Sequence, residues 1–146
     1  MMMNIREQIQ TVNTILSKTL DLYRLWAKRN QINYNTLLIL YTMDEKTICT
    51  QKQICECWAL PKQTVHGILT EFDKKGYIRD QINPANRKER LISFTDAGKQ
   101  YADQILQPLY TMEEHAMQKM NETNRQHLID CNEQYYALLK KEINHE

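Results

Sequence analysis

The sequence predicts a mainly α-helical protein with a small β-wing: a winged helix-turn-helix lobe between N- and C-terminal dimerisation helices. Three observations indicate this fold. The 146 residues include only three glycines and three prolines, so helices should dominate. Apolar residues recur at helical spacing in both terminal regions. Between these regions, two short helical patterns precede a glycine and two strand-like runs around a basic loop.

A long apolar stripe predicts the first helix. Its residues recur three or four positions apart: Ile5, Ile9, Val12, Leu16, Leu20 and Tyr23. A break at Arg29–Gln31 precedes a second helix, which Asn33 or Asn35 would cap. The buried face of this second helix should hold Leu37, Leu38, Leu40 and Tyr41. The run Thr47–Cys49 is β-prone and is expected to pair with the hairpin as a third strand.

The central segment carries the helix-turn-helix. Gln51–Trp58 has a helical pattern, and the following three residues form a tight break. Lys62–Lys75 is predicted to be a second helix with one apolar face, made of Val65, Ile68, Leu69 and Phe72. Gly76 supplies a left-handed stop. Tyr77–Arg79 and Leu91–Phe94 are predicted strands on either side of a basic loop, Asn83–Arg90.

Two more helices complete the chain. The Thr95 hydroxyl can cap a long helix, in which Pro108 should introduce a kink. A last helix should begin near Asn121. We expect three parts: residues 1–32, an N-terminal dimerisation helix; 33–98, the DNA-binding lobe; and 99–146, the C-terminal dimerisation helices. The apolar faces of the terminal helices exceed what one small lobe covers, which favours a homodimer. A monomeric bundle of five or six helices is the alternative.

The distribution of charge favours a nucleic-acid partner. The net charge is only +1, but Thr50–Thr95 holds eight basic against five acidic residues. A helix-turn-helix and a basic hairpin suit duplex DNA, since a helix can read the major groove and a loop can hold the backbone or minor groove. The expected DNA-binding residues are Thr50, Lys52, Lys62, Gln63, Thr64, His66, Arg87, Lys88 and Arg90.

Other classes of function find little support in the sequence. No GxSxG, HExxH or glycine-rich phosphate loop is present, so we expect no enzyme and no cofactor. The longest apolar run, Leu37–Tyr41, is too short to span a bilayer, and the start lacks a signal-peptide layout. We therefore expect a cytoplasmic protein without a membrane partner.

The cysteines and histidines do not form a metal-binding pattern. No CxxC occurs, and the side chains of Cys55 and Cys57 diverge by roughly 200° on a helix. We interpret Cys49, Cys55, Cys57 and Cys131 as reduced thiols, and oxidation sensing by any of them stays open. Glu114, His115 and His127 could assemble a metal site across two helices, but their spacing does not demand one, so no metal site is predicted.

The central residues resemble one family of transcription regulators. The runs Pro61–His66, Phe72–Ile78 and Asn83–Gly98 are similar to the recognition helix, strand and wing of the MarR family. The resemblance implies a homodimeric repressor on a near-palindromic operator, often relieved by a small phenolic or lipophilic effector. Asn83 and Asn86 stand where members often carry an aspartate that braces the wing arginine.

The effector remains the least specified part of that resemblance. The mechanisms of the hydroperoxide-sensing and zinc-responsive branches of that family do not carry over to this chain. The first needs an earlier cysteine and the second an earlier histidine, but no cysteine precedes Cys49 and no histidine precedes His66. A lipophilic effector remains by elimination, with Tyr23, Trp26, Tyr34 and Tyr41 as candidate lining residues. The alternative function is a winged-helix protein-interaction module or antirepressor that does not bind DNA.

Overall fold

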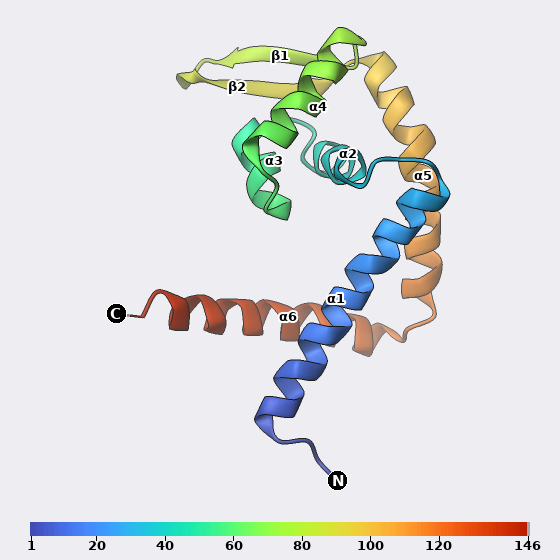
Figure 1. The fold of residues 1–146 in the computed structure, drawn as a ribbon, viewed down its shortest axis with the longest axis vertical. Helices are drawn as coiled ribbons and strands as arrows, with labels where there is room; N and C mark the ends of the chain where they lie inside the picture. The colour runs from blue at the N-terminus through green and yellow to red at the C-terminus, as the bar shows by residue number, and fades with distance from the viewer. Residues whose placement is uncertain (146) are drawn as a thin grey trace. The chain divides into compact units, whose positions relative to one another are not determined.

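The computed structural model describes residues 1–145, which form six helices and one two-stranded antiparallel sheet (Figure 1). The elements are α1 (Ile5–Arg29), α2 (Tyr34–Lys46), α3 (Gln51–Trp58), α4 (Lys62–Lys74), β1 (Ile78–Asn83), β2 (Asn86–Phe94), α5 (Asp96–Gln118) and α6 (Glu122–Ile143). The chain divides into two compact units, Met1–Leu106 and Gln107–Glu146. The predicted fold class, a mainly α-helical protein with a small β-wing, is confirmed.

The helix boundaries follow capping residues that the sequence signals. Asn33, one of the two expected caps, accepts a hydrogen bond from the N–H of Thr36 at 3.1 Å. Thr95 caps α5, because its hydroxyl accepts from the N–H of Gly98 at 3.1 Å. Asn121 caps α6 in the same way. Each cap satisfies an N–H that has no partner inside its helix.

The core of the first unit is built around α2. This helix packs against α1, α3 and α4, and it is buried on nearly all sides. The large apolar side chains of the unit that are fully buried are Leu37, Ile39, Leu40, Met43, Ile54, Val65 and Leu106. α3 and α4 lie against each other, and α4 also contacts β1. The helix-turn-helix and the hairpin therefore share one apolar core.

The start of α5 lies directly on the start of β1. Gly76 has a φ of 74°, the left-handed conformation that ends α4 as predicted. Thr95 donates from its hydroxyl to the carbonyl of Gly76 at 2.6 Å and from its N–H to the carbonyl of Tyr77 at 3.0 Å. A Cβ at Gly98 would lie 1.8 Å from that Tyr77 oxygen. The ring of Tyr101 stacks on the ring of Tyr77 with centroids 4.5 Å apart.

The hairpin is longer than the sequence predicted. The expected basic loop Asn83–Arg90 is wrong, since only Pro84 and Ala85 form the turn and the remaining residues belong to β1 and β2. Backbone pairing continues here although the side chains are polar and exposed. Where both faces of a strand are exposed to water, no buried face requires apolar and polar residues to alternate. The sequence of such a strand therefore carries only a weak strand pattern.

The tip of the hairpin contains a bulge. Ile82 lies opposite Arg90, whereas the next residue, Asn83, lies opposite Asn86. Residues Arg87–Glu89 therefore have no counterpart in β1 and form a bulge in β2. A bulge of this kind redirects side chains away from the plane of the sheet.

The expected third strand at Thr47–Cys49 is also wrong. Cys49 makes one isolated bridge with Ile92, through hydrogen bonds of 3.0 and 2.7 Å. Thr47 has a φ of 65°, a left-handed conformation that interrupts an extended run. A single bridge still anchors the segment before α3 to the hairpin.

The first and last helices expose broad apolar faces. In α1 only Ala27 is buried, and in α6 no described residue is buried. The exposed apolar residues of these helices are Ile5, Val12, Ile15, Leu16, Leu20, Leu22, Leu25, Leu128, Ile129, Leu138, Leu139 and Ile143. α5 runs through Pro108 as one helix. None of the helices in the described part of the chain combines the length and hydropathy that crossing a bilayer requires.

Candidate nucleic-acid interface

A groove opens between α3, α4 and the hairpin, all in the first unit. The apolar side chains of Leu69, Ile78 and Ile92 form part of its lining, and most other lining residues are polar. The charged residues of the lining are Lys52, Glu56, Lys62, Asp73, Asp80, Lys88, Glu89 and Arg90. The groove thus brings together the second helix of the helix-turn-helix and the hairpin, as the sequence predicted.

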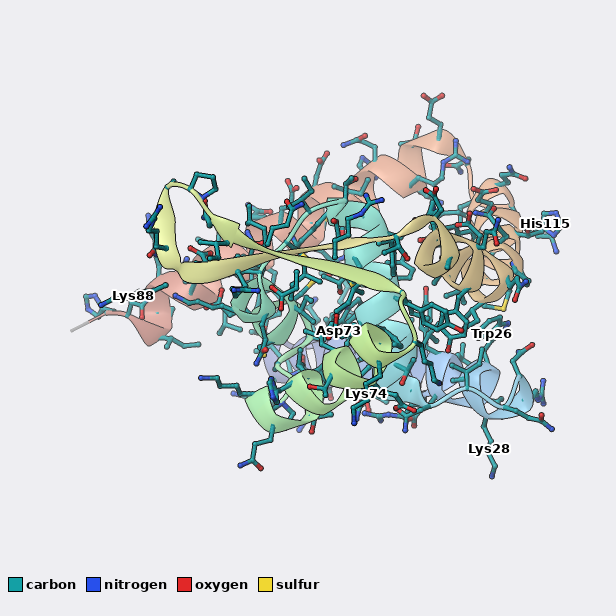
Figure 2. The ribbon with its side chains drawn as sticks, turned by 90° about the horizontal axis from the view of Figure 1, so that it is seen from above. Trp26, Lys28, Asp73, Lys74, Lys88 and His115 are labelled. Carbon is teal, nitrogen blue, oxygen red and sulfur yellow. The ribbon has the colours of Figure 1, made fainter. Side chains whose placement is uncertain are left out.

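α4 has a buried face and a polar face. The buried face holds Val65, Leu69 and Phe72, which anchor the helix in the core. Lys62, Gln63 and His66 are exposed on its first turns, as expected of residues that could enter a major groove. Thr64 is only half-buried and lies closer to the core than these three. Asp73 and Lys74 follow one another near the end of α4 (Figure 2), but only Asp73 lines the groove.

Two of the predicted DNA-binding cations are paired within the chain. Arg90 donates from Nε to Oδ1 of Asp80 at 2.7 Å and from Nη2 to the Asp80 carbonyl at 3.4 Å. Lys52 Nζ lies 3.8 Å from Glu56 Oε1, one turn along α3. Three other cations form no ion pair among residues 1–145: Lys62, Arg87 and Lys88. These three can engage an external anion without giving up an internal partner.

The groove lining is electrically balanced. It contains four lysine or arginine residues and four aspartate or glutamate residues. The excess of positive charge in the central segment therefore does not lie along the groove wall. Arg87, in the wing bulge, is outside the lining and exposed. Among the predicted DNA-binding lysines and arginines, the ones unpaired within residues 1–145 lie at the start of α4 (Lys62) and at the wing tip (Arg87 and Lys88).

The two wing asparagines shape the backbone of the tip. Asn83 Oδ1 accepts from the N–H of Ala85 at 3.0 Å, and Asn86 Oδ1 accepts from the N–H of Lys88 at 3.2 Å. The side-chain oxygens of both asparagines therefore bond the backbone of the turn and of the bulge. Asparagine favours such local bonds to its own backbone.

Thr50 has a structural position rather than an outward one. Its hydroxyl accepts from the N–H of Gln53 at 3.1 Å, and its own N–H donates to Gln53 Oε1 at 2.9 Å. The residue is only 6% exposed. This reciprocal cap fixes the start of α3, and Thr50 also contributes to the lining of the groove.

Two groove residues were missed by reasoning from the sequence. Asp80 pairs with Arg90, and Gln51 donates from its side chain to the carbonyl of Lys62 at 3.5 Å, which links α3 to α4. Opposite charges on two neighbouring strands can indicate an ion pair between the strands. Here the bulge shifts the register, so the sequence alone does not show which residues lie close to each other.

The four predicted effector residues lie on α1 and α2. All are half-buried, and none lines the groove: Tyr23, Trp26, Tyr34 and Tyr41. The Arg24 guanidinium lies 5.0 Å from the centroid of the Tyr34 ring. Tyr41 packs edge-on against Trp58, with centroids 6.1 Å apart. The rings of Tyr34 and Tyr41 therefore have partners inside the fold.

The cysteines differ in exposure. Burial raises the pKa of the Cys49 thiol to about 11, so this thiol is protonated and unreactive near neutral pH. Cys55 is half-buried and lines the groove, while Cys57 and Cys131 are exposed. Among residues 1–145, no three histidine, cysteine or acidic side chains lie together as a metal ion would require.

Comparisons with known proteins point to one family. A family model described as the MarR family matches residues 30–89. The structure is similar to NMB1585, a MarR family regulator from Neisseria meningitidis, with 28% identity, 97% of each chain covered and a TM-score of 0.80. Comparison with curated proteins finds no match.

Two further solved structures share the fold at lower identity. One is a mutant of MarR from Escherichia coli complexed with operator DNA: 12% identity, 91% and 99% coverage of this chain and that chain, TM-score 0.62. The other is BpsR from Bordetella bronchiseptica, whose DNA binding is regulated by 6-hydroxynicotinic acid: 13% identity, complete coverage of both chains, TM-score 0.60.

Proposed function

We propose that this chain, whose residues 30–89 match a MarR family model and whose fold is similar to that of a MarR family regulator, regulates transcription by binding double-stranded DNA as a homodimer. The observation that carries the proposal is the arrangement of the first unit. An exposed polar face of α4 lies beside unpaired cations at the helix start and at the wing tip. Such an arrangement fits a helix in the major groove and a wing on the adjoining backbone or minor groove.

The proposed contacts divide into base reading and backbone binding. Gln63 can form a bidentate pair with adenine, and Thr64 can touch a phosphate or a thymine methyl. Lys62, His66 and Lys88 are proposed to contact the backbone, with Lys52 at the edge of the interface. Arg87 is proposed to enter the minor groove, since a guanidinium loses water more readily than an ammonium.

The dimer is proposed from the apolar faces of α1 and α6. α6 has no buried residue, although Leu138 and Leu139 are large and apolar. Covering such faces with a second copy removes them from water at about 25 cal/mol per Å². A two-fold dimer would present two lobes to a near-palindromic operator with half-sites about one helical turn apart. The proposed activity on that operator is repression.

A small effector is proposed to relieve repression. BpsR, a relative in fold, is regulated by 6-hydroxynicotinic acid, a planar aromatic acid. We propose a planar lipophilic acid or phenol for this chain, with the rings on α1 and α2 as candidate contacts. Coupling of about 1–3 kcal/mol is typical and must be reciprocal. Calorimetry tests it, because saturating operator must weaken effector binding by the same factor.

One observation favours a second function. The balanced charge of the groove lining would also suit a polar protein partner. The alternative is therefore a winged-helix interaction module or antirepressor that does not bind DNA. Selection of duplexes from a random library by the wild-type protein separates the two functions, because an interaction module enriches no sequence.

Gln63→Ala tests base reading on the selected duplex. We expect it to cost about 1–3 kcal/mol of binding free energy and to relax preference at one base pair. Gln104→Ala is the matched control, since Gln104 is exposed on α5 outside the groove. Equal losses for Gln63→Ala on selected and random duplexes would show that Gln63 reads no base.

A further inference from the structure

The fold explains why two of the three positions occupied by glycine require this residue, but it gives no such explanation for the third. Gly76 adopts a left-handed conformation, and Gly98 meets the backbone of Tyr77 so closely that a Cβ would lie 1.8 Å from its oxygen. Gly67 has neither feature. It lies within the helix α4, and apart from its two chain neighbours and the backbone of its own helix, nothing among the described residues comes within 4 Å of a Cβ built there.

A glycine at this position weakens the helix that carries it. Gly67 is in the interior of α4, where glycine is less favourable than almost every other residue because its backbone loses more freedom on folding. The open space beside its Cα means that an alanine would fit without strain. The contacts inside the chain therefore favour replacement of Gly67, and the reason for a glycine lies outside the chain.

Gly67 lies on the outer face of α4. It follows Gln63 by four residues and precedes Lys74 by seven, so the three share one face at helical spacing. All three are exposed, and the opposite face holds the buried Val65 and Leu69. Gly67 is thus a gap in the middle of the helix surface that points away from the core.

We propose that Gly67 is the point at which duplex DNA comes closest to the backbone of α4. This inference rests on the proposed function and adds a specific contact to it. Without a side chain at this position, the helix can lie deeper in the major groove, and Gln63 can reach a base edge.

The surroundings of Gly67 fit DNA better than a protein partner. Most exposed neighbours on and beside this face are donors or cations: Lys62, Gln63, His66, Thr70 and Lys74. Two exposed carboxylates lie near them: Glu71, whose Oε1 is 3.5 Å from Lys75 Nζ, and Asp73, which lines the groove. The centre of a protein–protein interface is usually apolar. DNA, in contrast, presents phosphates that attract cations and base edges that accept hydrogen bonds.

Gly67→Ala tests the proposal through two measurements that should change in opposite directions. We expect the midpoint temperature of unfolding to rise by about 2–4 °C, because the helix gains stability. On a duplex selected by the wild-type protein, we expect affinity to fall about tenfold or more, because the methyl group holds the helix away from DNA. Gln104→Ala, on α5, should leave the affinity unchanged.

The outcomes are distinct. Unchanged DNA affinity in Gly67→Ala, with wild-type protein binding its selected duplex, would overturn the inference and leave the proposed function standing. A lower unfolding temperature would also overturn it, because Gly67 would then have a role inside the fold. Failure of the wild-type protein to select any duplex would remove the proposed function itself.

Discussion

Lys88→Ala isolates one proposed phosphate contact of the wing. Lys88 lies in the bulge of β2, lines the groove and forms no ion pair among residues 1–145. Its N–H donates to Asn86 Oδ1 at 3.2 Å, and alanine keeps this backbone bond. The substitution should therefore remove an ammonium group and leave the shape of the bulge unchanged.

The expected magnitude follows from counterion release. Each phosphate neutralised adds about 0.9 to the slope of log affinity against log salt, so removing one such cation from each protomer makes the slope of a dimer shallower by about 1.8. Between about 50 and 200 mM salt, the affinity deficit of the variant should consequently shrink by about tenfold. The deficit should be the same on selected and random duplexes, because phosphates carry no sequence.

Fluorescence anisotropy at several salt concentrations measures this slope. Lys28→Ala is the matched control, since it removes the same charge from the last turn of α1 (Figure 2), away from the groove lining. Its slope should equal that of the wild type. Analytical ultracentrifugation should show that both variants keep the oligomeric state of the parent protein.

Two results would refute this reasoning. An unchanged slope in Lys88→Ala, with the assembly intact, would show that Lys88 contacts no phosphate. An equal change in Lys28→Ala would attribute the effect to net charge and not to the wing. In either case the proposal that the ammonium group of Lys88 contacts a phosphate would be wrong.

Three further predictions concern the wing, the fold and the thiols. Arg87→Ala should weaken binding most on selected duplexes with A·T-rich flanks, and equal loss with G·C-rich flanks would exclude minor-groove entry. Gly98→Ala should destabilise the protein by about 3 kcal/mol in chemical unfolding, because its Cβ would collide with the Tyr77 carbonyl; unchanged stability would contradict the close approach. Cys49, whose pKa burial raises to about 11, should react with iodoacetamide far more slowly at about pH 8 than exposed Cys57; mass-mapped labelling at equal rates would disprove its burial.

Local signals were sufficient for much of the fold. Gly76 ends α4 and Thr95 starts α5, because left-handed stops and hydroxyl caps depend on a few neighbouring residues. The apolar spacing predicted the buried face of α4: Val65, Leu69 and Phe72 are buried, and Ile68, also predicted for this face, is half-buried. These features require no knowledge of distant contacts.

The hairpin needed the tertiary structure. The sequence showed that Arg87, Lys88 and Arg90 are basic, but not that Arg90 is held by Asp80 while the other two form no ion pair in the described chain. The shift of register at Ile82 determines which of these three cations lies near Asp80. Register depends on backbone pairing across the strands, which exposed polar side chains do not specify.

The sequence by itself determined the order of the helices, their caps, the buried face of α4 and the likeness to a family of regulators, because each is set by residue spacing along one chain. Only the tertiary structure decided which cations are unpaired and that Gly67 is the one glycine without a reason inside the described fold. The physical reason is that pairing, burial and free space are properties of residues far apart in sequence, brought together when the helices and hairpin pack.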